Sequence, residues 1–535
     1  MKSADLILHN GNIQTQDDLV LKASAVAISG NRILDIGSDK KILSLASKNT
    51  SIIDLEQKLV LPGFIDTHFH FYEWALNYDN IDFSRTLSFK EMEETIAKKA
   101  LELGRGKWVL GQGFNESDWP ENRMPERADL DRAAHDNPVC IWRSDLHLCV
   151  ANSMALELAG IDSSSHDPEE GKIAKDTSGN PTGVLRELAS NLIRDVLPGL
   201  SKKAVLDNME KAIKDAHSLG LTSIHDIRLM GGLDGADALK AWQDLRADNR
   251  LNIRCHVALP GEMTAQAVDL GLCTGFGDEI LKIGFLKFFS DGGMGARTAW
   301  VTEKYLDAEY GMALTAVKDI EKAAKKADQA GLSVMVHAVG DRAGKEIIEM
   351  FKRVESKDKS QCRIPHRIEH LQMILPEDLE KLSTLKNITV SCQPNNLSID
   401  ISMIDACAGP RGKYAYNLKN ILNTDIPLML SSDAPVADPN PFAGIYSAVT
   451  RQRMNHTPKG GWYMEQALDV AQAVKGYTIT PAMATGMGDS LGSIIKGKFA
   501  DLIVLDQDIY KIDSGKIADT KVDLTVFNGD IVHER

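Results

Sequence analysis

The chain has 535 residues, more than one hydrophobic core usually serves, so its length predicts a large domain joined to a smaller one. Hydrophobic residues make up 43% and charged residues 25% of the sequence, the composition of an ordinary soluble globular protein. The formal net charge of −14 argues against a nucleic-acid partner and against an anionic membrane surface, since both require a basic footprint.

No uninterrupted apolar run in the sequence is long enough to span a bilayer. The first residues, Met1 to Asp5, lack the charged and then apolar build of a signal peptide. The seven cysteines are scattered and odd in number, and none belongs to a Cys-x-x-Cys pair, as is typical of free thiols in a reducing compartment. We therefore expect no membrane partner and a cytoplasmic location.

Both ends of the chain predict short strands. Residues 6–13 and 524–531 each carry an Asn-Gly pair within a strand-like run, which is a hairpin signal. Neither end holds enough apolar residues to build a core alone. We therefore expect the two ends to meet in one small, discontinuous β-sandwich domain, formed by residues 1–62 and 488–535.

Between the ends, apolar strand-like runs alternate with longer helical patterns, which indicates an α/β protein with a parallel sheet. Eight runs are found, the number that closes a (β/α)8 TIM barrel, here expected over residues 63–487. The runs are Phe64–His70, Thr222–Asp226, Ile253–Val257, Ile283–Phe289, Val334–His337, Arg367–His370, Ile388–Cys392 and Leu428–Ser432. A ninth run, at residues 139–142, falls within an expected insertion of about residues 75–205, a stretch too long for a single crossover.

The first of the eight runs ends in the pair His68 and His70, behind a Pro62-Gly63 turn. Side chains alternate along a strand, so both imidazoles lie on the same side and can reach one metal ion together. A lone His-x-His is more often two ordinary histidines. The pair therefore indicates a metal site only together with further candidate ligands along the chain.

Active sites of such barrels lie at the carboxyl ends of the strands, and the later strand ends carry four more candidates. They are Lys287, His337, His370 and Asp433. A lysine in an apolar strand is costly unless it is paired or modified, so Lys287 is either a modified ligand or one half of an ion pair inside the barrel. Alone, either histidine would more often be a core residue and Asp433 a helix N-cap. The recurrence of all six residues at or near strand ends favours a metal site.

Five segments of the chain carry a resemblance to a known family. They are Pro62–His70, Lys287–Gly292, His337–Asp341, Arg367–His370 and Ser432–Pro435. These segments resemble the motifs of the amidohydrolase superfamily of metal-dependent hydrolases, in particular the branch of N-substituted formamide deformylases and amidohydrolase family 3. The resemblance extends over nearly the whole chain.

The resemblance implies a site for one or two divalent ions. The pair His68 and His70 would bind one metal together with Asp433, while His337 and His370 would bind a second. The strand lysine, carrying a carboxyl group derived from CO2, would bridge both ions. As a free cation this lysine would repel the metals, whereas the carbamate is an anionic oxygen ligand.

Imidazole and carboxylate ligands suit zinc, and a catalytic site keeps one position open for water. A bound metal lowers the pKa of its water from 15.7 to about 7, which supplies hydroxide for attack on a carbonyl at neutral pH. Asp433 is placed to take the proton and pass it to the leaving amine, as general base and then general acid. His370 or His147 would donate a hydrogen bond to the developing oxyanion.

His147 and Asn152 belong to a segment of the insertion that resembles a pocket-lining segment of similar proteins; a surface position for His147 is the alternative. The expected function is hydrolysis of a non-peptide C–N bond in a small N-acyl or N-formyl amide. The alternatives are opening of a cyclic amide, deamination, or a catalytically silent scaffold, against which the intact ligand set argues. A homodimer is one possibility for the assembly.

Overall fold

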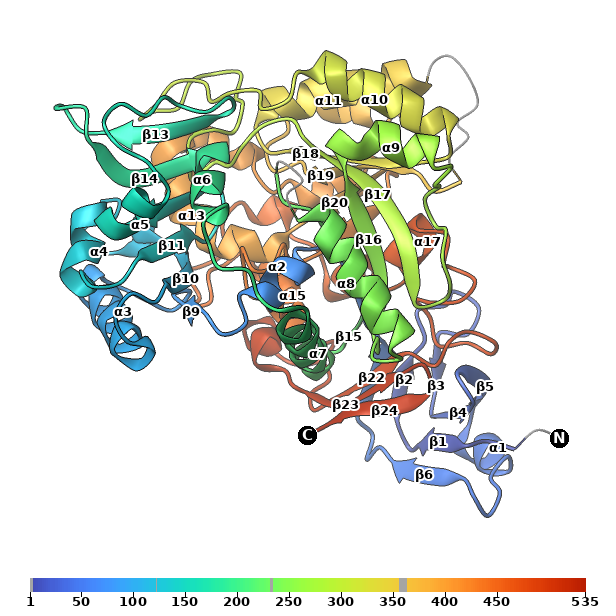
Figure 1. Ribbon diagram of the computed structural model, residues 1–535. Helices are drawn as coiled ribbons and strands as arrows, with labels where there is room; N and C mark the ends of the chain where they lie inside the picture. The colour runs from blue at the N-terminus through green and yellow to red at the C-terminus, as the bar shows by residue number, and fades with distance from the viewer. Residues whose placement is uncertain (1–2, 122, 231–233, 356–362) are drawn as a thin grey trace.

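The computed structural model describes residues 3–121, 123–230, 234–355 and 363–535 (Figure 1). Within these ranges, eight parallel strands form a nearly closed barrel in the order β21-β20-β19-β18-β17-β16-β15-β8. Their bounds are β8 (Phe64–Phe69), β15 (Leu221–Asp226), β16 (Arg254–Pro260), β17 (Leu281–Phe289), β18 (Val334–Ala338), β19 (His366–His370), β20 (Ile388–Cys392) and β21 (Leu428–Leu430). Each of the eight predicted runs overlaps one of these strands, which confirms the predicted barrel.

The first and last strands of the barrel are joined at their carboxyl ends by hydrogen bonds from the segment that follows β21. The backbone N–H of Ser432 donates to the Asp66 carboxylate of β8, at 3.2 Å from Oδ2. The N–H of Asp433 donates to the carbonyl of His68 at 2.8 Å, and the N–H of His70 donates to the carbonyl of Ala434 at 2.8 Å. These bonds hold Asp433 against the strand that carries the histidine pair.

Helices follow the barrel strands. Their bounds are α2 (Phe71–Leu76), α7 (Lys202–Ser218), α8 (Gly235–Ala247), α9 (Thr264–Asp269), α10 (Val317–Gln329), α11 (Asp341–Glu355), α12 (Pro376–Leu382), α13 (Pro394–Ala408), α14 (Leu418–Leu422), α15 (Pro441–Thr450), α16 (Val470–Gly476) and α17 (Ile479–Ala484). Of these, α15, α16 and α17 lie between the last barrel strand and the C-terminal strands. In α10, Ile320, Ala324 and Ala327 recur at helical spacing and are buried. They share one core with outward-facing strand residues such as Val336 and Ile368. Among the described helices, none combines the length and apolar character needed to cross a membrane.

The chain between β8 and β15 forms a second sheet beside the barrel, drawn in blue to green at the left of Figure 1. Its strands are β9 (Ile81–Asp82), β10 (Val109–Phe114), β11 (Val139–Arg143), β12 (Leu148–Ala151), β13 (Gly171–Lys175) and β14 (Pro181–Glu187). Its helices are α3 (Phe89–Leu103), α4 (Arg127–Ala133), α5 (Ser153–Leu158) and α6 (Asn191–Arg194). The ninth predicted strand is β11, which lies in this sheet and not in the barrel.

The two ends of the chain meet in two small sheets below the barrel (Figure 1). One sheet, in the order β24-β23-β22-β7-β2-β3, contains β2 (Asn12–Gln14), β3 (Lys22–Ala23), β7 (Leu59–Pro62), β22 (Leu502–Leu505), β23 (Val522–Phe527) and β24 (Asp530–Glu534). The other, in the order β5-β4-β1-β6, contains β1 (Leu6–His9), β4 (Ala25–Ser29), β5 (Arg32–Gly37) and β6 (Ser51–Asp54), with α1 (Asp39–Leu43) beside it.

Apolar residues from both terminal sheets form one cluster. Leu8 and Val26 of the four-stranded sheet are buried with Val60 and Val504 of the six-stranded sheet. Because β7 from the N-terminal part pairs with β22 from the C-terminal part, the predicted sandwich of both ends is confirmed. The domain bounds stay a prediction, since strand pairing does not show where a folding unit begins.

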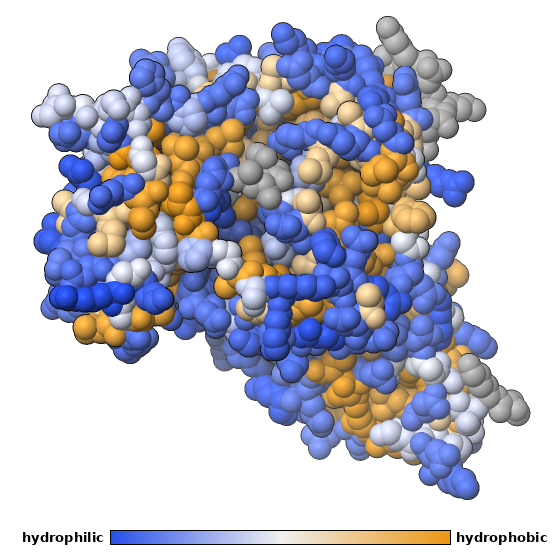
Figure 2. Space-filling view, viewed as in Figure 1, coloured by the Kyte–Doolittle hydropathy of each residue, from blue (hydrophilic) through white to orange (hydrophobic). Residues whose placement is uncertain are grey.

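Figure 2 shows the distribution of side-chain polarity on one face of the molecule. Hydrophilic side chains cover much of this face, and hydrophobic side chains gather over the insertion sheet and beside β16 and β17 (Figure 2). A large share of any folded surface is apolar, so these areas alone identify no interface. The homodimer therefore stays a prediction.

Candidate active site

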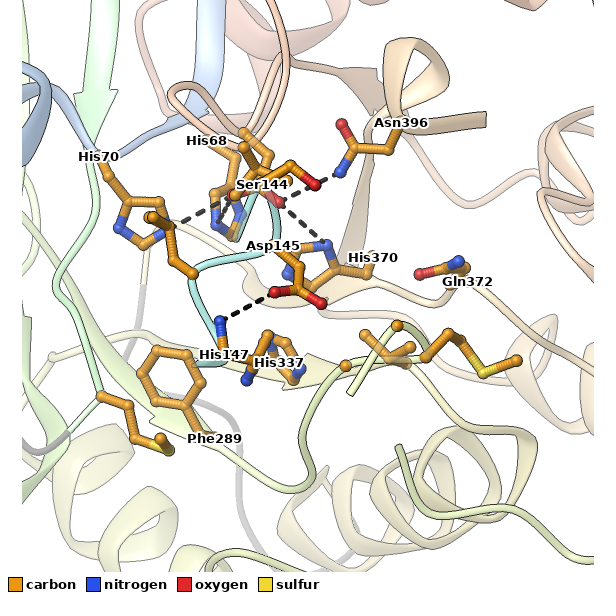
Figure 3. A pocket seen from close by; sticks show the side chains of 18 of the residues that line it. His68, His70, Ser144, Asp145, His147, Phe289, His337, His370, Gln372 and Asn396 are labelled. Atoms are coloured by element: carbon orange, nitrogen blue, oxygen red, sulfur yellow. Dashed lines mark hydrogen bonds and ion pairs between the residues drawn. The ribbon is translucent and has the colours of Figure 1, made fainter. Parts of the chain in front are cut away.

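A pocket opens at the carboxyl ends of the barrel strands, and its wall contains every candidate ligand predicted from the sequence. The histidines among them face one another in Figure 3. The candidate ligands are His68, His70, Lys287, His337, His370 and Asp433, and the wall also contains His147 from the insertion. The structure thus brings together side chains that lie hundreds of residues apart in the chain. Their roles as ligands and catalysts stay predictions.

The histidine pair converges on Asp433. His68 lies in β8, and His70 is the residue before α2. The Nε2 atom of each lies 3.3 Å from Oδ1 of Asp433. One ligand atom from each of the three residues lies within 4.8 Å of the other two, a spacing that could hold one ion. Among the described residues, this is the one group of three histidine, cysteine or acidic ligands at that spacing.

The surroundings of this group favour an ionised Asp433 and a neutral His68. Burial raises the pKa of Asp433, but the neighbouring His68 and His70 outweigh burial and hold the pKa below its usual range. Burial, together with the Lys287 amine, lowers the pKa of His68 well below 6.5. A carboxylate beside a neutral imidazole is the combination that binds a divalent cation.

Two of the candidate ligands have a left-handed backbone. φ is +66° at His370 and +61° at Asp433, a region that residues other than glycine seldom adopt. In a regular strand His370 would face the same way as Ile368, which is buried in the outer core. Instead, His370 lines the pocket. Backbone strain of this kind is concentrated at functional sites.

His370 connects the histidine pair to His337. The ring centroids of His370 and His68 are 4.8 Å apart, and those of His370 and His337 are 4.5 Å apart. Burial lowers the pKa of both His337 and His370 well below 6.5, with the neighbouring rings adding to the effect. The rings therefore form a continuous neutral cluster along the floor of the pocket.

Lys287 projects from β17 into the pocket, between outward-facing Leu286 and Phe288. Its ammonium nitrogen is buried, lies 4.6 Å from the centre of the Phe289 ring, and has no hydrogen-bond partner among the described residues. Burial lowers the pKa of Lys287 to about 8, although Glu369 and Asp433 oppose this. The alternative of an ion pair inside the barrel finds no partner within the described part of the chain, whereas an amine that carries a carboxyl group fits an orphaned nitrogen.

Glu369 orients the His68 ring through its Nδ1 atom, a role that was not predicted from the sequence. Its Oε2 lies 2.5 Å from His68 Nδ1, and its other oxygen accepts a hydrogen bond from Arg367 Nε. Arg367 in turn lies 2.9 Å from His225 Nδ1 through Nη1. The signal was present in Arg367-Ile368-Glu369-His370, because two opposite charges at strand spacing within a predicted barrel strand indicate an ion pair on one face of the sheet.

His147 reaches the pocket from the turn between β11 and β12, so it is not a surface residue. Its Nδ1 lies 2.7 Å from Glu187 Oε2, and the hydroxyl of Thr298 donates to the other oxygen of Glu187. Burial lowers the pKa of His147, but the Glu187 carboxylate outweighs burial and raises it to about 9. His147 is therefore an imidazolium at neutral pH, with its ring 5.5 Å from that of His337.

Asn152, expected to line the pocket, instead begins α5. Its side-chain oxygen accepts hydrogen bonds from the N–H groups of Ala155 and Val139, each at 3.0 Å. The residue is thus a helix N-cap that also fixes the start of β11. An asparagine directly after the apolar segment 148–151 fits either role, so the sequence alone did not decide.

The pocket wall contributed by α13 was also missed. Asn396 donates a hydrogen bond through Nδ2 to Asp433 Oδ2 at 3.3 Å, and Asp400, one helical turn later, lines the same pocket. Gln372, two residues after His370, lies beside them (Figure 3). No metal-site motif includes these residues, and Asn396 and Asp400 reach the site only because α13 packs over the barrel.

Comparisons with known proteins agree with this geometry. A sequence model described as the amidohydrolase family matches residues 51–533. Protein LONG AFTER FAR-RED 3 of Arabidopsis thaliana is 32% identical over 515 residues, which are 94% of this chain and 87% of that protein. The N-substituted formamide deformylase of Arthrobacter pascens is 26% identical over 546 residues, which cover 99% of this chain and 98% of that protein. An uncharacterized metal-dependent hydrolase from Pyrococcus furiosus is 30% identical, with a TM-score of 0.73 over 95% of this chain and 100% of that one.

Proposed function

The chain belongs to the amidohydrolase family, and from this premise we propose that it hydrolyses a non-peptide C–N bond in a small N-acyl or N-formyl amide. The observation that carries the proposal is the convergence of His68, His70 and Asp433 at the floor of a barrel pocket. The similarity to an N-substituted formamide deformylase supports the amide class. The cytoplasmic location is part of the same proposal.

The residues of the pocket fit one or two divalent ions, of which zinc suits imidazole and carboxylate donors. The pair His68 and His70 would hold one ion with Asp433, and His337 and His370 the second. A carbamate on the orphaned Lys287 amine would supply oxygen ligands to both. When bound, such ions supply Lewis-acid chemistry, since they lower the pKa of water and polarise a carbonyl oxygen.

Asp433 moves the proton in the proposed reaction. Its carboxylate is buried and its pKa is held low, so it is a base at neutral pH. Its Oδ2 accepts a hydrogen bond from Asn396, which fixes the plane of the carboxylate. We assign to Asp433 the removal of a proton from the attacking water and its delivery to the leaving amine nitrogen.

His147 stabilises the negative charge that develops on the carbonyl oxygen. Its Nδ1 is held by Glu187, which leaves Nε2 free to donate a hydrogen bond into the pocket. A buried imidazolium is a stronger donor than a neutral ring, because the charge assists the bond. His370 could donate in the same way, but its proposed role as a metal ligand requires a neutral ring.

The test combines metal analysis with a substrate screen. Zinc-loaded protein is assayed for amine release from N-formyl amines, N-acyl amino acids and cyclic ureas, beside the variants His68→Ala and His166→Ala. We expect His68→Ala to lose both bound metal and activity, and the exposed His166→Ala control to keep both. Ring opening or ammonia release without hydrolysis of any open-chain amide would instead favour a cyclic-amide hydrolase or a deaminase.

A further inference from the structure

Helix α13 runs along the pocket away from the proposed metal ligands. Asn396 contacts the Asp433 carboxylate at 3.3 Å, and Asp400 lies four residues further along the same helix. Residues four apart lie on the same helix face, about 6 Å from each other along the axis. Asp400 therefore lines the pocket about one helical turn from the reacting centre.

Both hydrogen bonds to the Asp400 carboxylate go to the same oxygen atom. Its Oδ2 accepts a hydrogen bond from the Tyr416 hydroxyl at 2.6 Å and from Gln372 Nε2 at 3.0 Å. In the described part of the chain, Oδ1 receives no hydrogen bond. The two donors fix the orientation of the carboxylate and leave its second oxygen free for another donor.

Among the described residues, no cation around the pocket forms an ion pair with this carboxylate. Arg143 is bound to Asp145 at 2.7 Å, and His147 is bound to Glu187 at 2.7 Å, so each cation has a carboxylate of its own. No lysine, arginine or histidine nitrogen within the described ranges lies at ion-pair distance from Asp400. Burial raises the pKa of Asp400 to about 6, and outweighs the Tyr416 hydroxyl, the Arg143 charge and Gln372, which lower it.

We propose that Asp400 is a subsite for a charged amino group of the substrate, placed about one helical turn from the carbonyl that is hydrolysed. The inference rests on the proposed function and narrows it. The substrates would be amides in which an ammonium group lies about 6 Å from the reacting amide, such as singly N-formylated or N-acylated diamines. Tyr416 and Gln372 then act as positioning residues for the carboxylate.

Two probes of matched shape test the subsite. N-formyl-1,4-diaminobutane carries an ammonium at the end of its chain, and N-formylpentylamine carries a methyl group in the same place. We expect kcat/KM of the zinc-loaded protein for the charged probe to fall by about 10- to 100-fold in Asp400→Asn, because a hydrogen bond between charged groups is lost. For the neutral probe we expect a change of less than about twofold, since Asp400 makes no bond to a methyl group.

The control is Asp405→Asn, which removes a negative charge from the same helix outside the pocket. Its amide oxygen can still accept the hydrogen bond from Trp462 Nε1, so the variant should behave as wild type with both probes. A binding experiment separates the subsite from the chemistry. 1,4-Diaminobutane is titrated calorimetrically into wild type and Asp400→Asn, with butylamine, which has one ammonium, as a second titrant.

If neither formamide is hydrolysed but diaminobutane binds at least tenfold more weakly to Asp400→Asn, the proposed amide class fails and the subsite stands. Equal loss of kcat/KM for both probes in Asp400→Asn would overturn the subsite and leave the hydrolase intact. Equal binding of diaminobutane by wild type and variant would overturn it as well, whichever substrates the protein hydrolyses.

Discussion

His68 receives its orientation from Glu369, whose Oε2 lies 2.5 Å from His68 Nδ1. A carboxylate accepts a hydrogen bond from Nδ1–H. The ring proton therefore stays on Nδ1, and Nε2 is free to bind a metal. An amide at position 369 can donate to Nδ1 instead, which would move the ring proton to Nε2. We predict that Glu369→Gln weakens zinc binding by about 10- to 100-fold, measured by competition with a chelator.

The control for this prediction is Glu377→Gln, which changes an exposed residue in the first turn of α12 and should bind zinc as wild type does. The far-ultraviolet circular dichroism of both variants reports whether the fold is retained. If Glu369→Gln is folded and binds zinc as tightly as the control, then Glu369 serves only to balance the charge of Arg367.

His147 links pH to stability through Glu187. Burial lowers the pKa of His147, but Glu187 outweighs burial and raises it from 6.5 to about 9. The folded state keeps a proton that the unfolded state loses near pH 6.5. The stabilisation is therefore complete below pH 6.5 and disappears as the pH rises through about 9. The shift corresponds to about 3 kcal/mol of the free energy of unfolding.

We predict that Glu187→Gln reduces the free energy of unfolding most at pH 6, and that the difference from wild type shrinks toward pH 10. Urea unfolding of the metal-free protein at several pH values measures this difference, and bound metal then makes no contribution to it. A difference that stays constant from pH 6 to pH 10 would mean that His147 does not carry the charge assigned to it.

At the level of elements, β15 approaches the turn before β8 so closely that only a glycine fits there. A Cβ atom at Gly63 would lie 2.2 Å from Oγ1 and 2.5 Å from Cγ2 of Thr222. We predict that Gly63→Ala lowers the free energy of unfolding by about 1–3 kcal/mol, because the strand must shift to admit the methyl group. The loss should be smaller in a Thr222→Gly background, where the clashing side chain is absent.

The matched control is Gly199→Ala, where an added Cβ meets no atom within 4 Å. Its effect on the free energy of unfolding, measured with urea, should stay within about 0.5 kcal/mol. Equal losses for Gly63→Ala in both backgrounds would show that contact with Thr222 is not the cause.

The strands of the barrel could be predicted from the sequence, because short apolar runs separated by helical patterns have few other interpretations. The place of His370 at a strand end could be predicted too, but not the backbone conformation that turns its side chain into the pocket. Regular alternation places it with Ile368 in the outer core, and the left-handed backbone at φ +66° turns it into the pocket. That backbone conformation depends on the folded surroundings, and the residue type does not indicate it.

At the level of the whole molecule, the pocket draws on three parts of the chain. The barrel supplies the candidate ligands, the insertion supplies His147, and α13 supplies Asn396 and Asp400. The candidate ligands could be predicted from their positions at strand ends, and His147 from the resemblance of its segment to a pocket-lining segment of similar proteins. The contribution of α13 could not be predicted, because it depends on how a helix packs over the barrel and not on any local pattern.

The barrel and the terminal sheets are joined by a buried ion pair at the amino end of β16. Arg254 Nε lies 2.7 Å and Nη2 3.0 Å from the two oxygens of Asp501, and Nη2 also donates to Asn528 Oδ1 at 3.1 Å. Both side chains are almost fully buried, at 2% and 3% exposure. Removal of one partner leaves a buried charge without its counterion, so Asp501→Asn should cost about 3–5 kcal/mol of unfolding free energy.

The double variant Arg254→Met, Asp501→Leu should lose less than the sum of the two single variants, because no unpaired charge remains. At saturating zinc, kcat/KM per folded molecule should stay within about twofold of wild type, since the pair lies at the opposite end of the barrel from the pocket. Urea unfolding and steady-state kinetics on the same preparations measure both quantities. Additive losses would mean that Arg254 and Asp501 stabilise the fold independently, and a fall in kcat/KM without unfolding would mean that the terminal sheets influence the site directly.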